Sequence, residues 1–175
     1  MSSLHGIARS WHSGSFLVVG DVDAGAGCRR GTTTVSTGAS VRKEIRIHRR
    51  ADDVWARIED PGCIQDWFPG IVASTVDGTT RVITLGSGIA MPEEIVTSDP
   101  IQHRFQYRIT VPLFRNHLGT IDVIDLGDET TLVVYSTDAD PRTMALVIGA
   151  ATAAALIELR DQMEAGETES NGKGT

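Results

Sequence analysis

Cysteine is scarce in this 175-residue chain, which contains only Cys28 and Cys63. Two cysteines do not make a disulfide framework, and neither lies in a metal-binding pair. The five histidines show no His-x-x-x-His spacing, so a zinc site is not predicted. A Ser-His-Asp order, a P-loop and a Rossmann fingerprint are also missing. We therefore expect no metal, no other cofactor and a reducing, cytoplasmic environment.

Positive charge and long apolar runs are limited as well. The formal net charge is −7, whereas nucleic-acid-binding proteins usually carry a basic face. The longest apolar stretch, MALVIGAATAAALI, is too short and too rich in alanine for a membrane span, and it is typical of a buried helix. We expect neither a nucleic-acid partner nor stable membrane insertion, and the sequence does not identify a protein partner.

The two ends of the chain lack hydrophobic periodicity. Residues 1–40 are rich in small and polar side chains, and residues 166–175, GETESNGKGT, are mostly polar. Both compositions are typical of disordered segments, although a translation start near Val35 or Val41 is an alternative explanation for the first. The predicted folded domain is residues 41–165, a length suited to one hydrophobic core.

Strand and helix patterns fill this domain. VRKEIRIHR is read as a strand and is followed by two short helices, ADDVWARIEDPG and CIQDWFPG. Six further strands are predicted at about residues 71–76, 80–86, 93–98, 103–111, 117–125 and 130–137, and a long helix from after Asp140-Pro141 to about Met163. Short links between successive strands predict an antiparallel sheet with the helices on one side, which is an α+β fold.

The long helix has an unusual composition. It is apolar nearly all round between Ala145 and Ile157, so we expect it to be packed into a concave surface. Glycine and alanine occupy most of its centre, where leucine, isoleucine or phenylalanine would normally fill a core. Such small side chains indicate either a close approach to the sheet or an unfilled cavity, and the residues alone leave both open.

Several segments resemble one known superfamily in their order and spacing. DDVWARIED and QDWFPGI are similar to its first two helices, GTTRVITLGSG to a strand that ends at a gate, and EEIVTSDPIQHRFQYRI and FRNHLGTIDV to the hairpin and latch loop that follow. This is the START-type helix-grip (SRPBCC) superfamily, in which the chain resembles the bacterial polyketide cyclase/dehydrase-like lipid-binding group and, distantly, the plant abscisic-acid receptors. The resemblance implies a seven-stranded curved antiparallel sheet wrapped around the C-terminal helix, with a ligand pocket between them.

The resemblance also implies a gate over this pocket at residues 87–92. The glycines on either side of Ser87 agree with this, because they permit hinge-like backbone angles. Ile89 and Met91 would be poorly placed in an exposed turn unless they cover something apolar. The alternative is an ordinary loop whose two apolar residues pack on the edge of the core.

Polar residues on the inward faces of two strands are candidates for contacts inside the pocket. Tyr107 lies on the apolar face of HRFQYRITV, although a core tyrosine bonded to the backbone is the alternative. Arg81 shares a face with Ile83, and a buried guanidinium needs an acidic partner, which Glu93 or Glu94 could supply. An ion pair with only a structural role is the alternative for Arg81.

Further candidates rest on the resemblance. By position it implies that Glu94 reaches the ligand through water, that His117 contacts it, and that Phe114 is the apolar tip of a latch at residues 112–115. Gln65 stands where the receptors have a carboxylate-binding lysine, so we expect a neutral or weakly polar ligand. The candidate ligand-binding residues are Trp67, Arg81, Ile83, Ser87, Ile89, Met91, Glu94, Phe105, Tyr107, Phe114, His117 and Ala153, and the catalytic candidates are Tyr107 and His117. Trp67 has plain core packing as its alternative.

Three functions fit these features. We prefer binding of a small hydrophobic molecule, such as a lipid, polyketide or aromatic compound, under the gate. The enzymatic alternative is a polyketide aromatase or cyclase, in which Arg81, Tyr107, Glu94 or His117 would assist enolisation and dehydration. The third is an interaction module whose gate moves onto a protein partner when ligand binds.

Overall fold

Seven antiparallel strands form one sheet in the computed structural model, which describes residues 38–165. The predicted disordered segments lie outside the described residues, except for residues 38–40. Residues 39 and 40 already belong to the first strand, because they pair with Ala139 and Asp138. The sheet therefore begins two residues before the predicted domain boundary.

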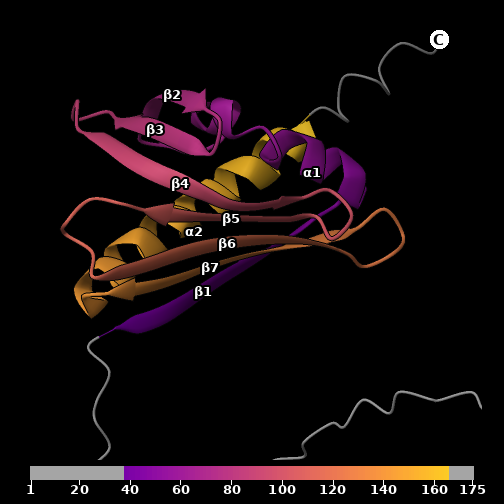
Figure 1. Cartoon of the computed structure of the whole chain (residues 1–175). Helices are drawn as coiled ribbons and strands as arrows, with labels where there is room; N and C mark the ends of the chain where they lie inside the picture. Colours follow the sequence, from indigo (N-terminus) through magenta and orange to yellow (C-terminus); the bar gives the residue numbers. More distant parts are fainter. Residues whose placement is uncertain (1–37, 166–175) are drawn as a thin grey trace, which may run out of the picture. The chain divides into compact units, whose positions relative to one another are not determined.

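The strands are β1 (Ala39–Ile47), β2 (Ile71–Asp77), β3 (Thr80–Leu85), β4 (Ala90–Asp99), β5 (Arg104–Ile109), β6 (Asn116–Asp125) and β7 (Thr131–Asp140). Their order across the sheet is β1-β7-β6-β5-β4-β3-β2, so β1 lies beside the last strand and the others follow as hairpins. Figure 1 shows helix α2 (Arg142–Ala165) lying along one face of the curved sheet. The connection from β1 to β2 holds α1 (Ala51–Ile58) and the 3-10 helix η1 (Pro61–Asp66). The predicted helix-grip fold is confirmed.

Local capping sets the boundary between the two short helices. The first ends at Ile58, and Pro61 begins the second instead of only terminating the first. Asp60 is the cap, since its Oδ1 accepts a hydrogen bond from the Gly62 backbone nitrogen at 2.8 Å. Proline suits this first helical position because its missing N–H would have no partner there.

The connection between β3 and β4 is shorter than predicted. β4 begins at Ala90 instead of about residue 93, because Ala90 already pairs with Thr84 of β3. The link is reduced to residues 86–89, a turn in which Gly88 has a φ of 84°. Glycine suits this position because other residues rarely adopt such angles.

Helix α2 packs against β1 and β7 along one side. A Cβ atom added to Gly149 would lie only 2.6 Å from Val41 Cγ1, so glycine allows helix and sheet to approach closely here. On the other side Leu146, Val147 and Ile157 are 50–61% exposed. The sheet therefore covers only one side of the helix, and part of its apolar surface is not packed against the sheet. The length and hydropathy of α2 also match a membrane span, but its buried face lies on the sheet.

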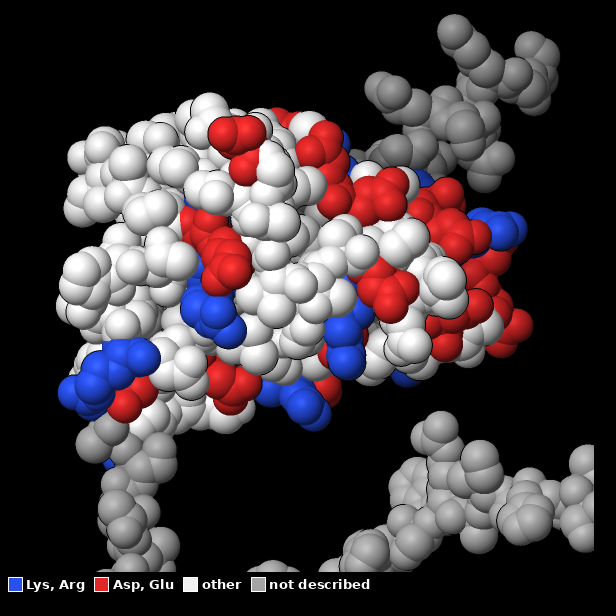
Figure 2. Space-filling model, viewed as in Figure 1, with Lys and Arg blue, Asp and Glu red and all other residues white. Residues whose placement is uncertain are grey.

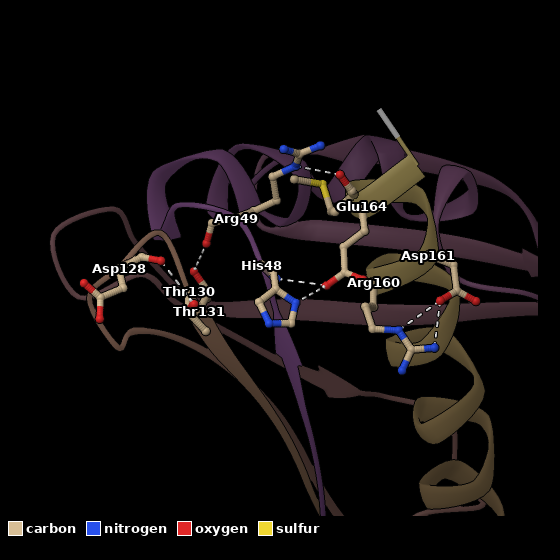
Figure 3. A network of polar contacts seen from close by, with 9 residues as sticks. His48, Arg49, Asp128, Thr130, Thr131, Arg160, Asp161 and Glu164 are labelled. Atoms are coloured by element: carbon tan, nitrogen blue, oxygen red, sulfur yellow. Dashed lines mark hydrogen bonds and ion pairs between the residues drawn. The ribbon is translucent and has the colours of Figure 1, made fainter. Parts of the chain in front are cut away.

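The C-terminal end of α2 is tied to the end of β1 (Figure 3). Glu164 Oε1 accepts a hydrogen bond from the His48 backbone nitrogen at 2.9 Å and lies 3.0 Å from His48 Nδ1. Arg49 Nε donates to the Met163 carbonyl at 2.7 Å, and the Arg49 carbonyl accepts from the Thr131 hydroxyl of β7 at 2.7 Å. These bonds satisfy a carbonyl at the helix end and join α2 to the residues after β1, which are themselves bonded to β7.

Substitution of Gly149 with alanine should destabilise the protein when Val41 is present but stabilise a Val41→Ala background. The new Cβ would collide with a stiff β-branched side chain, and overpacking of this kind costs about 1–3 kcal/mol. Without the collision, alanine is favoured over glycine in a helix by about 1 kcal/mol. Urea unfolding of the four proteins of this cycle measures both effects, and additive free energies of unfolding would contradict the contact.

Candidate functional site

A cavity of about 540 Å³ lies between α2 and the sheet. Its wall is lined by Ile64, Phe68, Pro69, Gly70, Ile71, Ile83, Leu85, Gly86, Ser87, Met91, Tyr107, Ile109, Phe114, Tyr135, Met144, Val147, Ile148 and Ala151. None of these side chains is charged, and hydroxyl groups come only from Ser87, Tyr107 and Tyr135. The wall is therefore almost wholly apolar.

The outer edge of the cavity is made by the turn after β3, the loop between β5 and β6, and the beginning of α2. Ser87 and Val147 are exposed wall residues at this edge, and Leu113 of the loop is 58% exposed. The three segments lie at the left end of Figure 1. Figure 2, viewed from the same side, shows uncharged side chains over the upper part of this end, a cluster of charged side chains at its lower left, and many carboxylates at the other end. Charged side chains are therefore present at this end, where Arg115 of the loop pairs with Asp140 at the end of β7, although none lies on the cavity wall.

Two tyrosines meet on the cavity wall. The hydroxyl oxygens of Tyr107 on β5 and Tyr135 on β7 are 2.7 Å apart. Between the two strands, β6 has Gly119 opposite Tyr107, and a Cβ there would lie 2.3 Å from Tyr107 Cε1. The missing side chain leaves room for the Tyr107 ring to lie over β6 and reach Tyr135. Burial raises the pKa of both phenols, so both hydroxyls keep their protons at neutral pH.

A buried ion pair lies beside Tyr107. Arg81 Nε on β3 donates to Glu93 Oε2 on β4 at 2.6 Å, and both side chains are only 2% exposed. Burial raises the pKa of the Glu93 carboxyl, and the Arg81 guanidinium opposes that rise. The guanidinium carbon is 5.0 Å from the centre of the Tyr107 ring, within cation–π range. Of the two acidic partners predicted for Arg81, Glu93 is therefore the one that pairs with it. Arg81 itself is not among the residues of the cavity wall.

Glu94 and His117 lie away from the wall. Glu94 Oε2 is 3.1 Å from Arg108 Nη1, and both side chains are about half exposed on the outside of the sheet. Glu94 faces outward because it follows the inward-facing carboxylate of the ion pair along the strand. His117 is 1% exposed, and its ring centre lies 5.4 Å from that of Tyr107 and 5.3 Å from that of Phe114. It therefore supports two wall residues instead of contacting the cavity itself.

The surroundings of His117 keep its ring neutral. Nδ1 accepts a hydrogen bond from the Ile109 backbone nitrogen at 3.1 Å, which places the proton on Nε2. Within residues 38–165, Nε2 has no hydrogen-bond partner. Burial lowers the pKa of His117 to about 4, so the ring is poorly matched to acid–base chemistry near pH 7. In the same range of residues, no three His, Cys, Asp or Glu side chains form a group that could hold a metal ion.

The other predicted site residues divide between the wall and its surroundings. The structure places Ile83, Ser87, Met91, Tyr107 and Phe114 on the wall. It places Trp67 and Phe105 in the core, Ile89 in the turn with 58% exposure, and Ala153 half-buried on α2, none of them on the wall. Ala151, two residues before Ala153, is the small residue that α2 contributes.

Tyr135 and Phe68 line the cavity although neither was predicted to do so. Tyr135 shares the buried face of β7 with Val133 and Thr137, an alternation that is visible in TLVVYSTDA. Phe68 follows η1, and its ring packs edge-on against Tyr135 at a centre distance of 6.4 Å. The alternation could have placed Tyr135 inside, whereas nothing local indicates where Phe68 points.

The chain resembles known proteins in both sequence and fold. Residues 38–165 match the family described as "Polyketide cyclase / dehydrase and lipid transport". No curated protein matches the chain.

Three solved structures illustrate the likeness in fold. The protein XoxI from Bacillus cereus has 22% identity and a TM-score of 0.70, with 74% of this chain and 98% of that one covered. A START superfamily protein from Mycobacterium smegmatis has 13% identity and a TM-score of 0.62, with 71% and 97% covered. The di-domain ARO/CYC BexL of the BE-7585A biosynthetic pathway has 18% identity and a TM-score of 0.62, with 72% and 46% covered. At such identities these likenesses show the fold.

Alanine at Gly119 should destabilise the protein by about 1–3 kcal/mol, because its Cβ would overlap the buried Tyr107 ring. The matched control is Gly86→Ala, whose Cβ would meet nothing closer than 3.8 Å. The control should change the free energy of unfolding by no more than about 0.5 kcal/mol. Urea unfolding distinguishes the two, and equal effects would contradict the packing of Tyr107 over β6.

The stability of the protein should fall on acidification partly through His117. Its pKa is depressed from 6.5 to about 4, so the unfolded state takes up the proton first as the pH falls. The stabilisation is complete above pH 6.5 and is lost between pH 6.5 and 4, on the order of 2–3 kcal/mol at pH 4.5. His117→Gln keeps an acceptor but does not titrate, so its unfolding free energy should fall less over this range. An unchanged pH dependence in the variant would refute this assignment.

Proposed function

The chain belongs to the polyketide cyclase/dehydrase and lipid-transport family, and on this premise we propose that it binds a small hydrophobic molecule between α2 and the sheet. The observation that carries the proposal is the apolar cavity of about 540 Å³. Protein interiors are close-packed, so a space of this size inside a small domain calls for an explanation. Its volume falls within the range of about 300–1,000 Å³ typical of ligand pockets.

The wall supports a neutral ligand. Burial of apolar ligand surface would drive binding at about 25 cal/mol per Å². No lysine or arginine is among the wall residues, so a carboxylate would lose its hydration without gaining an opposite charge. Arg81 does not alter this argument, because Glu93 already pairs with it. Lipids without an acidic group, polyketides and aromatic compounds remain the proposed ligand classes.

We propose further that residues 87–92 act as the gate, in which residues 87–89 are the turn that moves and residues 90–92 are the paired beginning of β4. Ser87 and Met91 belong to the wall, while Ile89 between them is 58% exposed. The turn is joined to the segment before β2, since the Gly86 backbone nitrogen donates to the Gly70 carbonyl at 2.8 Å. A small movement of this turn would bring Ile89 onto a bound ligand, where its burial would favour the closed state.

Catalysis as an aromatase or cyclase has less support from the geometry. Such chemistry needs at least two convergent titratable groups near the substrate, and the wall offers only Tyr107 and Tyr135. The other candidates, Arg81, Glu94 and His117, lie off the wall. The likeness to the aromatase/cyclase BexL supports the fold that such an activity would use. Binding is therefore our proposal, in a cytoplasmic setting as the cysteine content predicts.

Filling the cavity should abolish binding. Ala151→Trp and Ala154→Trp both add an indole at an exposed position of α2, but only residue 151 lines the cavity. Titration with the neutral fluorescent probe phenylnaphthylamine should show binding to the natural protein and to Ala154→Trp but not to Ala151→Trp. Thermal unfolding checks that both variants are folded. Equal binding by the two variants would refute the proposed site.

The gate can be tested with a matched pair of exposed isoleucines. Ile89→Asp should weaken phenylnaphthylamine binding by about tenfold or more, because closure would then bury a charge instead of an apolar side chain. Ile101→Asp, at a 92% exposed position before β5, should leave the affinity unchanged. Both variants should unfold within about 0.5 kcal/mol of the natural protein. An unchanged affinity in Ile89→Asp would rule out closure by this residue.

A further inference from the structure

We infer that the hydroxyl pair of Tyr107 and Tyr135 donates a hydrogen bond to a ketone oxygen of the bound ligand. This inference rests on the proposed binding function and narrows its ligand class. It predicts a neutral apolar compound with a carbonyl group positioned at the pair, and it excludes both plain hydrocarbons and carboxylates as preferred ligands.

The two hydroxyls leave one proton without a partner. Each phenol carries one O–H, and the 2.7 Å contact between the two oxygens uses only one of these protons. Both rings line the cavity and are at most 4% exposed, so bulk water has little access to them. A buried donor without an acceptor costs free energy, and a ligand oxygen would remove that cost. The pair can therefore donate one hydrogen bond into the cavity.

No other buried polar side chain competes for this role on the wall. Ser87 is the third hydroxyl there, and it is exposed in the turn after β3, where water can hydrate it. The remaining wall residues present only hydrocarbon or thioether side chains. An oxygen on the ligand would thus find its hydrogen bond at the two tyrosines, and the ligand would be oriented by that contact.

The surroundings of the pair favour a neutral acceptor. Burial raises the pKa of both phenols, so the pair stays uncharged and acts as a donor at neutral pH. The guanidinium of Arg81 lies over the Tyr107 ring, but its charge is balanced by Glu93 at 2.6 Å. A carboxylate at the pair would have no unpaired cation to compensate its desolvation. A ketone needs no such compensation.

The contact between the Tyr107 and Tyr135 hydroxyls depends on Gly119 in the strand between them. Tyr107 and Tyr135 are separated by β6, and any side chain at Gly119 would occupy the space of the Tyr107 ring. Two tyrosines on non-adjacent strands are therefore brought together across a position that only glycine accommodates. The rings are packed on the sheet, so the donor has a fixed place in the cavity.

Three matched three-ring compounds test the inference: fluorene, fluorenone and fluorene-9-carboxylate. Calorimetric titration of the natural protein should show fluorenone binding about tenfold more tightly than fluorene, which corresponds to one net hydrogen bond. The carboxylate should bind more weakly than either. In the Tyr107→Phe/Tyr135→Phe double variant, fluorenone and fluorene should bind equally, because the rings remain while both donors are lost. Ser87→Ala should keep the preference for the ketone.

A spectroscopic readout does not depend on the double variant being folded. The infrared carbonyl band of fluorenone bound to the natural protein should lie at lower frequency than in a hydrocarbon solvent, as expected of a hydrogen-bonded ketone. An unshifted band, a ketone preference that persists in the double variant, or a preference lost in Ser87→Ala would each overturn the inference. If fluorene binds as tightly as fluorenone, only this inference fails and the binding function stands. If none of the three compounds binds, the inference falls together with the proposed function.

Discussion

The close contact between Gly149 of α2 and Val41 of β1 determines where this domain is filled and where it is hollow. It holds the helix against β1 and β7, and the bonds from His48 and Arg49 to the end of α2 fix it there. The strands on the far side of the sheet curve around the helix without filling the space beside it. The cavity wall therefore comes mainly from β3, β4 and β5, from the segment around η1, and from the outer part of α2.

Polar groups inside the sheet are arranged so that they carry no net charge. Arg81 and Glu93 neutralise each other, the two tyrosines are protonated, and burial keeps His117 neutral. Buried ion pairs often stabilise a protein no more than apolar residues of similar volume would, because desolvation offsets their attraction. Here the ion pair lies against the Tyr107 ring and helps to fill the space beside it. The cavity wall is therefore neutral, and its buried polar groups are the hydroxyls of Tyr107 and Tyr135.

Much of the fold could be predicted because its signals are local. The alternation of apolar and polar residues, together with the turn residues, predicted all seven strands. The apolar run before the C-terminal tail predicted α2. The inward direction of Tyr107 followed from the same alternation.

The site was predicted less completely than the fold. Glu93 and Glu94 could not be ranked as partners of Arg81 from composition, because the choice depends on the register that sets Arg81 opposite Glu93. The alternation in β7 could have placed Tyr135 inside, but its contact with Tyr107 two strands away could not be predicted.

The small residues in α2 had two possible explanations, a close approach to the sheet and an unfilled cavity. Both apply, at different positions of the helix. Gly149 permits close approach to the sheet, and Ala151 borders the cavity, whereas Ala153 does neither. A helix repeats every 3.6 residues, so its sequence shows which residues share a face but not which face meets the sheet. By itself, then, the sequence determined the order of elements and the inside and outside of each strand, because these depend on neighbouring residues. Only the tertiary structure decided the rotation of α2, the strand register and the meeting of Tyr107 with Tyr135, because each depends on contacts between segments far apart in the chain.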